Sequence, residues 1–321
     1  MRAILRNKYG SPDVLGLQET QKPELVDDGV LVRVRAASIN RGDWYALTGT
    51  PYVARAQLGL FKPKSQLVGV DFAGTVEAVG RDITEFQPGD DVFGARSGAL
   101  AEYVCVRKSV ALKPAGLTFE EAAALPVAAI TALQGLRDKA QLQPGQKVLI
   151  NGASGGVGTF AVQIAKALDA EVTAVCSTRN VDRMRSLGAD HVIDYIQEDF
   201  TRGDQRYDVI LDVTGSRSWS DCKRVLNPQA ILVIVGAPSG NSFLGPLGHI
   251  ANVLLAALPG SRKAVFFIAK LNKPDLAVLR ELVDTGKMTP VVEKRYELSE
   301  SADAFRYMGE GHAQRKIVVT M

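Results

Sequence analysis

The chain has 321 residues, of which 46% are hydrophobic and 23% are charged. This composition is typical of a globular protein, and the length exceeds what one hydrophobic core usually supports, so two domains are expected. The formal net charge is only +3, from 38 basic and 35 acidic side chains. So small a charge argues against nucleic acid or an anionic membrane surface as a partner.

The three cysteines, Cys105, Cys176 and Cys222, are widely separated along the chain. Their number and spacing exclude a disulfide framework and suit a reducing compartment. The first ten residues lack the apolar core of a signal peptide. The longest apolar stretch, 243–258, is interrupted by glycine, proline, histidine and asparagine, and falls short of the ~20 residues of a membrane helix. We therefore expect a cytoplasmic protein that does not span a membrane.

The first third of the chain has the pattern of a β-rich domain. In 31–37, Val32 and Val34 alternate with Arg33 and Arg35, which predicts a strand with one buried face. Further strands are expected within 68–79, 87–93 and 101–106. Short strands joined by Gly/Pro turns favour a small barrel or sandwich.

The character changes near residue 118. An alanine-rich segment, 118–135, is predicted to be helical and opens with a capping box formed by Thr118 and Glu121. Strands alternating with helices then follow, at 147–151, 171–176, 191–194, 208–213 and 230–235. This alternation predicts a parallel sheet with helices on both faces. Later elements are expected at 264–268 (strand), 274–285 and 299–310 (helices) and 316–320, a last strand that returns to the first domain.

The most informative motif joins the first two strands of that alternating region. An apolar strand runs into the glycine-rich turn 152–158 and continues as a helix. Gly155 lets the backbone approach a pyrophosphate, Gly158 lets the helix pack against the strand, and the helix N-terminus directs N–H groups at the phosphates. Ala153 replaces the first glycine of the usual G-x-G-x-x-G pattern. The alternative is a glycine-rich turn without a ligand.

The end of the second strand distinguishes NAD from NADP. Enzymes that prefer NAD usually place a carboxylate there, bonded to the ribose 2′-hydroxyl. This chain has Ser177 instead, followed by Arg179. A hydroxyl and a guanidinium can bind a 2′-phosphate, so NADPH is the predicted cofactor. The alternative is that Arg179 is only a solvated residue at a helix start.

Metal and hydrolase chemistry lack residues to support them. None of the three histidines, His191, His249 and His312, lies near another histidine or a cysteine in the sequence. Zinc sites usually draw on closely spaced cysteine and histidine ligands, so no metal site is predicted. No G-x-S-x-G motif is present either.

Together these motifs resemble the medium-chain dehydrogenase/reductase superfamily, in its zinc-independent quinone oxidoreductase branch. The resemblance covers essentially the whole chain and rests on the order of eight segments: 69–80, 88–94, 101–104, 125–133, 151–158, 187–195, 212–215 and 311–319. Zinc-dependent relatives have a cysteine ligand where this chain has Asn40, and a His-Glu pair where it has Val70 and Asp71. The terminal motif departs from the pattern as well, with Arg315 in place of glycine.

The resemblance implies an α/β fold in two parts. A GroES-like β-barrel domain would span 1–122 and be completed by 268–321, with a Rossmann doubly wound parallel sheet inserted at 123–267. The cofactor is expected in the cleft between the two parts, at the carboxyl ends of the strands. The implied NADPH contacts are Thr131, Ser154, Gly155, Gly156, Val157, Ser177, Arg179, Tyr195, Val235, Gly236, Phe267 and Lys316.

The expected reaction is hydride transfer from NADPH to a quinone or an α,β-unsaturated carbonyl. Without a metal, the charge that develops on a substrate oxygen must be stabilised by delocalisation and hydrogen bonds, which these substrates allow. The active-site loop of the family matches Asn40, Asp43 and Tyr45. Tyr45 is the predicted substrate-facing hydroxyl, with a packed aromatic ring as the alternative. Asn40 is the predicted positioning residue, and Asp43 is expected to structure the loop.

Three further expectations concern specificity, class and assembly. The 243–258 segment either caps the substrate site, packs as an ordinary amphipathic helix, or contacts a membrane surface. The alternative to an enzyme is a non-catalytic NADPH-binding regulatory or structural module, because a fold does not establish turnover. A homodimer, if one forms, is expected to pair through the strand at 230–235.

Overall fold

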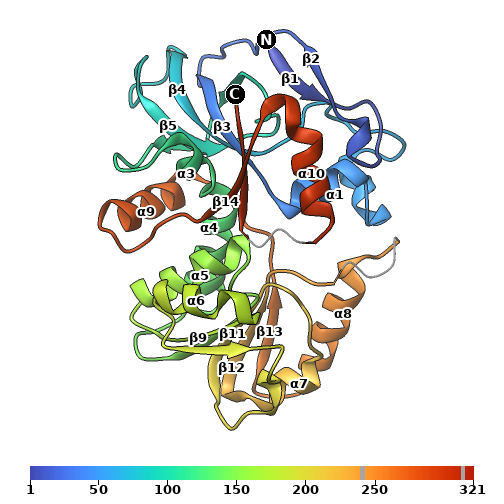
Figure 1. Ribbon diagram of the computed structural model, residues 1–321, viewed down its shortest axis with the longest axis vertical. Coiled ribbons are helices and arrows are strands. Elements are labelled where there is room, and N and C mark those ends of the chain that lie inside the picture. Colours follow the sequence, from blue (N-terminus) through green and yellow to red (C-terminus); the bar gives the residue numbers. More distant parts are fainter. Residues whose placement is uncertain (239–242, 312–314) are drawn as a thin grey trace. The chain divides into compact units, whose positions relative to one another are not determined.

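The computed structural model describes residues 1–238, 243–311 and 315–321, so His312 lies outside the described residues. The chain divides into two compact units: unit 1 comprises 1–130 with 271–321, and unit 2 comprises 131–270 (Figure 1). Unit 2 is therefore inserted within the sequence of unit 1. The division falls at 130/131 and 270/271, whereas the sequence led us to expect 122/123 and 267/268.

Unit 1 is built on a seven-stranded sheet whose neighbours follow the order β14-β15-β3-β4-β5-β7, with β6 also paired to β3. A separate hairpin joins β1 to β2. All the pairings are antiparallel except that between β14 and β15. The strands of unit 1 are β1 (Arg2–Leu5), β2 (Gly16–Glu19), β3 (Val30–Ile39), β4 (Asp71–Val79), β5 (Asp91–Ala95), β6 (Tyr103–Val106), β7 (Val110–Leu112), β14 (Val292–Glu297) and β15 (Lys316–Thr320).

The central strand of unit 1 is β3, which pairs with β4, β6 and β15. As predicted, Val32 and Val34 are buried while Arg33 and Arg35 are exposed. Because β15 pairs with β3, the last strand returns to the first domain, also as predicted. The core that these strands enclose is apolar and includes Phe72, Leu100 and Phe305.

The predicted helix at 118–135 is interrupted. Its capping box is confirmed, because Glu121 N–H donates to Thr118 Oγ1 at 3.2 Å and Thr118 N–H donates to Glu121 at 2.9 Å. However, α3 (Phe119–Ala123) ends before Pro126, where α4 (Pro126–Leu133) begins. Proline lacks an N–H and its ring clashes with the preceding turn, which explains the break. Beyond α4, Ala140 N–H donates to the Gly135 carbonyl, as in a wide helical turn.

The remaining α-helices of unit 1 lie in the connections between its strands. They are α1 (Arg41–Thr48), α2 (Arg55–Leu58), α9 (Lys273–Asp284) and α10 (Ser301–Gly309). The last two were predicted at 274–285 and 299–310. Helix α1 was not predicted as a helix, because its sequence mixes polar and aromatic residues without a clear apolar face.

Unit 2 is a doubly wound parallel sheet, as predicted. Its six strands follow the order β10-β9-β8-β11-β12-β13, and every pairing is parallel. The strands are β8 (Lys147–Asn151), β9 (Glu171–Cys176), β10 (His191–Asp194), β11 (Tyr207–Asp212), β12 (Leu226–Ile234) and β13 (Lys263–Phe266). In Figure 1, α5 (Gly156–Ala167) and α6 (Val181–Ser186) lie on one side of this sheet, and α7 (Trp219–Arg224) and α8 (Pro246–Ala257) on the other.

The expected dimer strand is not at an edge of this sheet. Strand β12, predicted at 230–235, pairs with β11 on one side and β13 on the other, so its backbone groups are already used. The strand at the edge next to β12 is β13, which the sequence placed at 264–268 without assigning it an edge position. A pairing of two chains through β12 is therefore ruled out by the sheet order.

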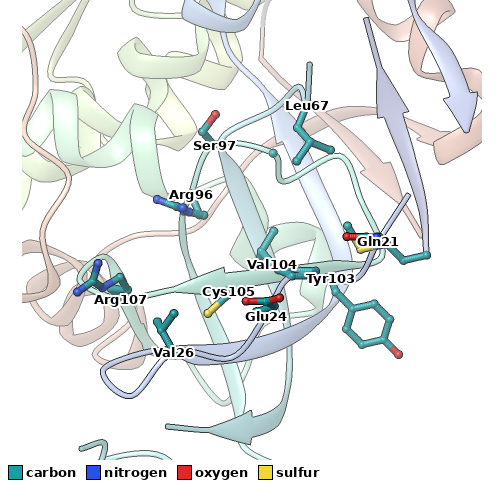
Figure 2. Close-up of a pocket in the computed structure, with 13 residues that line it drawn as sticks. Gln21, Glu24, Val26, Leu67, Arg96, Ser97, Tyr103, Val104, Cys105 and Arg107 are labelled. Atoms are coloured by element: carbon teal, nitrogen blue, oxygen red, sulfur yellow. The ribbon is translucent and has the colours of Figure 1, made fainter. Parts of the chain in front are cut away.

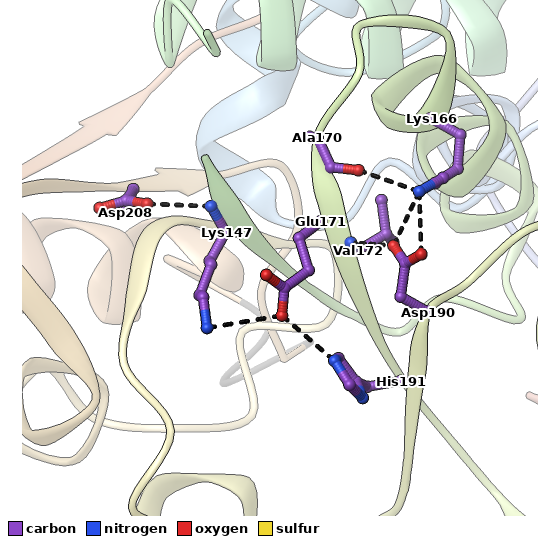
Figure 3. Close-up of polar contacts among 8 residues, drawn as sticks. All are labelled: Lys147, Lys166, Ala170, Glu171, Val172, Asp190, His191 and Asp208. Atoms are coloured by element: carbon purple, nitrogen blue, oxygen red, sulfur yellow. Dashed lines mark hydrogen bonds and ion pairs between the residues drawn. The ribbon is translucent and has the colours of Figure 1, made fainter. Parts of the chain in front are cut away.

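The amino-terminal edge of the unit 2 sheet carries charged pairs (Figure 3). Lys166 Nζ lies 2.9 and 2.8 Å from the two Asp190 oxygens, and Asp190 also accepts from Val172 N–H at 2.7 Å. Glu171 lies 3.1 Å from the ring of His191, which accounts for one of the three histidines. These partly exposed pairs contribute little stability individually.

Candidate functional site

The glycine-rich turn between β8 and α5 is tightly built. Gly152 has φ +85°, and a Cβ at that position would lie 2.6 Å from Thr214 Cγ2. A Cβ on Gly158 would lie 2.2 Å from the Gly152 carbonyl oxygen and 2.6 Å from Ala153 Cα, so only glycine lets the helix approach the turn. By contrast, a Cβ on Gly155 would meet only the Gly152 oxygen, at 3.3 Å. The space beside Gly155 is therefore open.

The start of α5 supplies uncommitted donors. Gly155 is the N-cap residue and no side chain caps the helix. The first N–H groups of a helix have no partner within it, so those of Gly156 and Val157 can serve a ligand. An N-terminus of this kind, beside a position without a Cβ, fits a phosphate group. The predicted pyrophosphate contacts Ser154, Gly155, Gly156 and Val157 are all half-buried.

Four other predicted cofactor residues follow the carboxyl ends of the parallel strands. Ser177 follows β9, Tyr195 follows β10, Val235 follows β12 and Phe267 follows β13. Gly236 lies so close to the end of β11 that a Cβ there would be 2.1 Å from the Val213 oxygen. The carboxyl edge of such a sheet is where ligands bind in doubly wound folds. Unit 2 thus gathers these residues at one edge, on different strands.

Thr131, Phe267 and Tyr195 differ in their surroundings. Thr131 is half-buried in α4. Phe267 is half-buried, with the Lys139 ammonium 5.8 Å from its ring centroid. Tyr195 keeps 56% of its surface exposed, and its N–H donates to the Cys176 carbonyl, which joins the ends of β10 and β9.

No carboxylate directly follows β9, as the sequence indicated. Ser177 is buried, its Oγ accepts from Asn180 Nδ2 at 3.1 Å, and Arg179 is exposed two residues later. An acidic group stands at the end of the neighbouring strand, β10, where the Asp194 carboxylate accepts from Thr178 Oγ1 at 2.5 Å. That hydrogen bond lowers the pKa of Asp194, so the carboxylate is ionised and bound locally.

Sequence reasoning missed a polar network at the ends of β8 and β11, in which Asn151 and Asp212 are buried. Asn151 Nδ2 lies 2.9 Å from Asp212 Oδ1 and 2.8 Å from Thr214 Oγ1. Asp212 also accepts from the N–H of Gly215 at 2.8 Å. Burial raises the pKa of Asp212, and these donors oppose the shift. The signal in the sequence was an aspartate at the end of an apolar strand. Burying its carboxylate is costly unless hydrogen-bond donors surround it.

In unit 1, the predicted active-site residues lie at the start of α1. Asn40 is its N-cap residue, and its N–H donates to Asp43 Oδ2 at 2.8 Å. Asp43 therefore structures the helix start, as expected. Tyr45 is half-buried one turn further on, with the Arg41 guanidinium 5.5 Å from its ring centroid. Burial raises the pKa of the Asp43 carboxyl to about 7.

Three buried polar residues, Ser38, Asp71 and Lys316, adjoin the half-buried Asn40. These four residues are here named the Asp71 network. Asp71 Oδ2 accepts from Ser38 Oγ at 3.0 Å, Asn40 Nδ2 at 2.8 Å and Lys316 Nζ at 3.2 Å, while Oδ1 accepts from Val127 N–H at 3.0 Å. Lys316 Nζ also donates to Asn40 Oδ1 at 2.5 Å. Lys316, expected among the cofactor contacts, is thus held by side chains of unit 1.

Other features of the described residues stand apart from these sites. Unit 1 has a cavity of about 320 Å³, shown in Figure 2, whose lining includes Leu67, Arg96 and Cys105 but none of the predicted site residues. Across the described ranges, no group of three or more histidine, cysteine, aspartate or glutamate side chains is arranged to hold a metal ion. Nor does any described helix have the length and apolar character needed to cross a bilayer.

The 243–258 segment has two faces. Ile250, Val253 and Ala257 of α8 are buried in the core of unit 2, as in an ordinary amphipathic helix. On the other side, Leu255 and Leu258 keep 64% and 76% of their surface exposed. The packing alternative therefore accounts for the inner face of this helix only.

Two known protein families match this chain, over different ranges of residues. The family described as "Zinc-binding dehydrogenase" matches residues 187–319, and the "Alcohol dehydrogenase GroES-like domain" matches residues 26–115. The chain is 33% identical to a 2-methylene-furan-3-one reductase of Solanum lycopersicum, over 99% of this chain and 79% of that protein.

Another sequence relative and a solved structure are also named as oxidoreductases. The chain is 33% identical to an NADPH-dependent alkenal/one oxidoreductase, chloroplastic, of Arabidopsis thaliana, again over 99% of this chain and 79% of the relative. A solved structure of the quinone oxidoreductase from Coxiella burnetii superposes with a TM-score of 0.87 at 30% identity, covering 100% of this chain and 99% of that one.

Proposed function

Because the chain belongs to the medium-chain dehydrogenase/reductase superfamily, in its branch of quinone oxidoreductases and alkenal/one reductases, we propose that it is an NADPH-dependent oxidoreductase that reduces quinones or α,β-unsaturated carbonyls. The observation that carries the proposal is the carboxyl edge of the unit 2 sheet. There, an open position at Gly155 adjoins the uncapped N-terminus of α5. This edge suits the pyrophosphate of NAD(P)H.

The choice of NADPH over NADH rests on the end of β9. A 2′-phosphate there would meet the Ser177 hydroxyl and the Arg179 guanidinium rather than a carboxylate. A negative charge, Asp194, ends the neighbouring strand, and its oxygens already accept from Thr178 and from the backbone of Ile196. We therefore propose that Arg179 supplies the charge that selects NADPH.

NADPH supplies the hydride when bound, and this chain's side chains have to bind, orient and donate protons. Reduction at the β carbon of an enone leaves negative charge spread toward the carbonyl oxygen, where a hydrogen-bond donor is needed. The Tyr45 hydroxyl is the proposed donor. Asn40 is a positioning residue, since its amide is bound by Asp71 and Lys316 and it begins the helix that carries Tyr45.

A screen of NADPH oxidation tests this function. Purified protein is assayed against quinones, linear enones and γ-ketols, with an anaerobic control that separates substrate reduction from reaction with oxygen. Saturable turnover with at least one class is expected, with kcat/KM higher for NADPH than for NADH. Binding of NADPH without turnover on any class would refute the enzyme and support the alternative, a non-catalytic NADPH-binding module. Preference for NADH would refute the cofactor assignment.

The cellular compartment proposed is the cytoplasm, because Cys105, Cys176 and Cys222 are all free thiols.

A further inference from the structure

The ion pair between Lys316 and Asp71 is almost fully removed from water. The exposed fractions of the two residues are 3% and 0%, and Lys316 Nζ lies 3.2 Å from Asp71 Oδ2. Burying two charges is costly, and a pair of apolar side chains would often fill the same space at lower cost. Packing alone therefore does not explain why this site holds a buried ion pair.

The two charges determine the orientation of one neutral group, the Asn40 amide. Its oxygen accepts from the Lys316 ammonium at 2.5 Å, and its nitrogen donates to the Asp71 carboxylate at 2.8 Å. An ammonium can only donate and a carboxylate can only accept. A flipped amide would direct its NH₂ group at the ammonium and its oxygen at the carboxylate, so only the observed orientation satisfies both charges.

Fixing Asn40 fixes the beginning of α1. Asn40 is the N-cap residue, and its N–H donates to Asp43 Oδ2 at 2.8 Å. The network thereby ties α1 to β4, through Asp71, and to β15, through Lys316. A second cation holds the same helix from another strand, because Arg6, just after β1, donates to the Ala46 carbonyl.

The geometry points to Lys316 as a positioning residue, whose buried ammonium fixes the amide of Asn40 and so the start of the helix that presents Tyr45. This inference rests on the proposed function, in which Tyr45 contacts the substrate. It moves Lys316 from the cofactor contacts implied by family resemblance to the support of the active-site helix.

The same ammonium acts on the Asp43 carboxyl. The charged groups that face Asp43 are Asp71 on β4, Lys316 on β15 and Arg6 after β1. Burial and the Asp71 charge raise the pKa of Asp43, to about 7, while the Lys316 charge lowers it. Removing the ammonium should therefore move this pKa higher still. This effect supplies a readout that does not depend on turnover.

The test compares Lys316→Met with a control lysine. Lys273→Met is the matched control, because Lys273 forms an exposed ion pair with Glu85 in the same unit. For Lys316→Met we expect kcat to fall tenfold or more, with KM for NADPH within twofold of wild type. In the wild type, the free energy of unfolding should fall with rising pH until the pH reaches about 7, the pKa of Asp43. In Lys316→Met this end point should lie at a higher pH. Lys273→Met should change none of these quantities.

A double variant guards against simple misfolding. Lys316→Met alone leaves the Asp71 carboxylate buried without its cation, so Lys316→Met/Asp71→Asn removes both charges together. We expect the double variant to regain thermal stability but not kcat. Recovery of wild-type kcat, or an increase in KM for NADPH with kcat unchanged, would overturn the positioning role.

Failure of the proposed function has a different signature. In that case the wild type itself would not turn over any quinone or enone. The upward shift in pH dependence on Lys316→Met would then still be expected, and its absence would overturn the coupling of Lys316 to Asp43.

Discussion

Replacing Gly158 by alanine should separate the packing of the glycine turn from its binding role. The added Cβ would lie 2.2 Å from the Gly152 carbonyl oxygen and 2.6 Å from both Ala153 Cα and the Ala153 oxygen. All three are backbone atoms, so no side chain can rotate to relieve the contact. Helix α5 would have to move away from the turn by more than ~1 Å to reach an ordinary contact distance.

The expected size of the effect follows from two opposing contributions. Overpacking of this kind costs about 1–3 kcal/mol, and contacts this short with backbone belong at the upper end. Alanine is favoured over glycine inside a helix by about 1 kcal/mol. The net loss of folding free energy should therefore be about 2 kcal/mol, which lowers the melting temperature by roughly 4–8 °C.

Gly155→Ala is the matched control, three residues earlier in the same turn. Its Cβ would meet only the Gly152 oxygen, at 3.3 Å, and its φ of −75° suits alanine. Its melting temperature should stay near that of the wild type, while its affinity for NADPH falls because a methyl group occupies the proposed pyrophosphate position. Calorimetry and NADPH fluorescence titration measure the two quantities. The reasoning is refuted if Gly158→Ala is as stable as the wild type, or if Gly155→Ala binds NADPH unchanged.

Three further predictions concern catalysis, cofactor choice and pH. Tyr45→Phe should lower kcat about tenfold or more while NADPH affinity stays constant, and an unchanged kcat would remove Tyr45 from the mechanism. Arg179→Ala should raise KM for NADPH about tenfold and leave KM for NADH near its original value, as steady-state kinetics would show. Because the pKa of Asp43 is raised to about 7 in the folded state, the native protein binds the extra proton, so stability falls as pH rises from about 4 to 7, by at most about 1.4 kcal/mol per unit. Asp43→Asn should flatten this part of the stability profile in denaturation curves, and an unaltered slope would contradict the assignment.

Much of unit 2 could be predicted because its signals are local. Strands β8, β9 and β10 have the predicted bounds, since each is a short apolar run bounded by turn residues. The turn from Gly152 to Gly158 could be predicted as well, because the strand, the glycines and the helix follow one another along the chain. Pro126 was a local signal too, although the alanine-rich pattern around it favoured one continuous helix.

The Asp71 network could not be predicted, because its members are distant in sequence. Lys316 and Asp71 are 245 positions apart, and they meet only because β15 and β4 flank β3 in one sheet. Sheet order and register are set by packing across the whole unit, which no local pattern encodes. Sheet order also decides the position of β12: we expected a dimer contact at this strand, but β13 pairs with it and occupies the edge.

Composition and motif order by themselves determined two domains, a dinucleotide-binding turn and the family. Each of these depends on side chains close together in the chain, whose hydrophobic period and turn chemistry act locally. The tertiary structure alone decided which polar residues meet, and hence that the Lys316 ammonium donates to the Asn40 amide. Burial makes a charge dependent on its neighbours, and those neighbours are chosen by the fold.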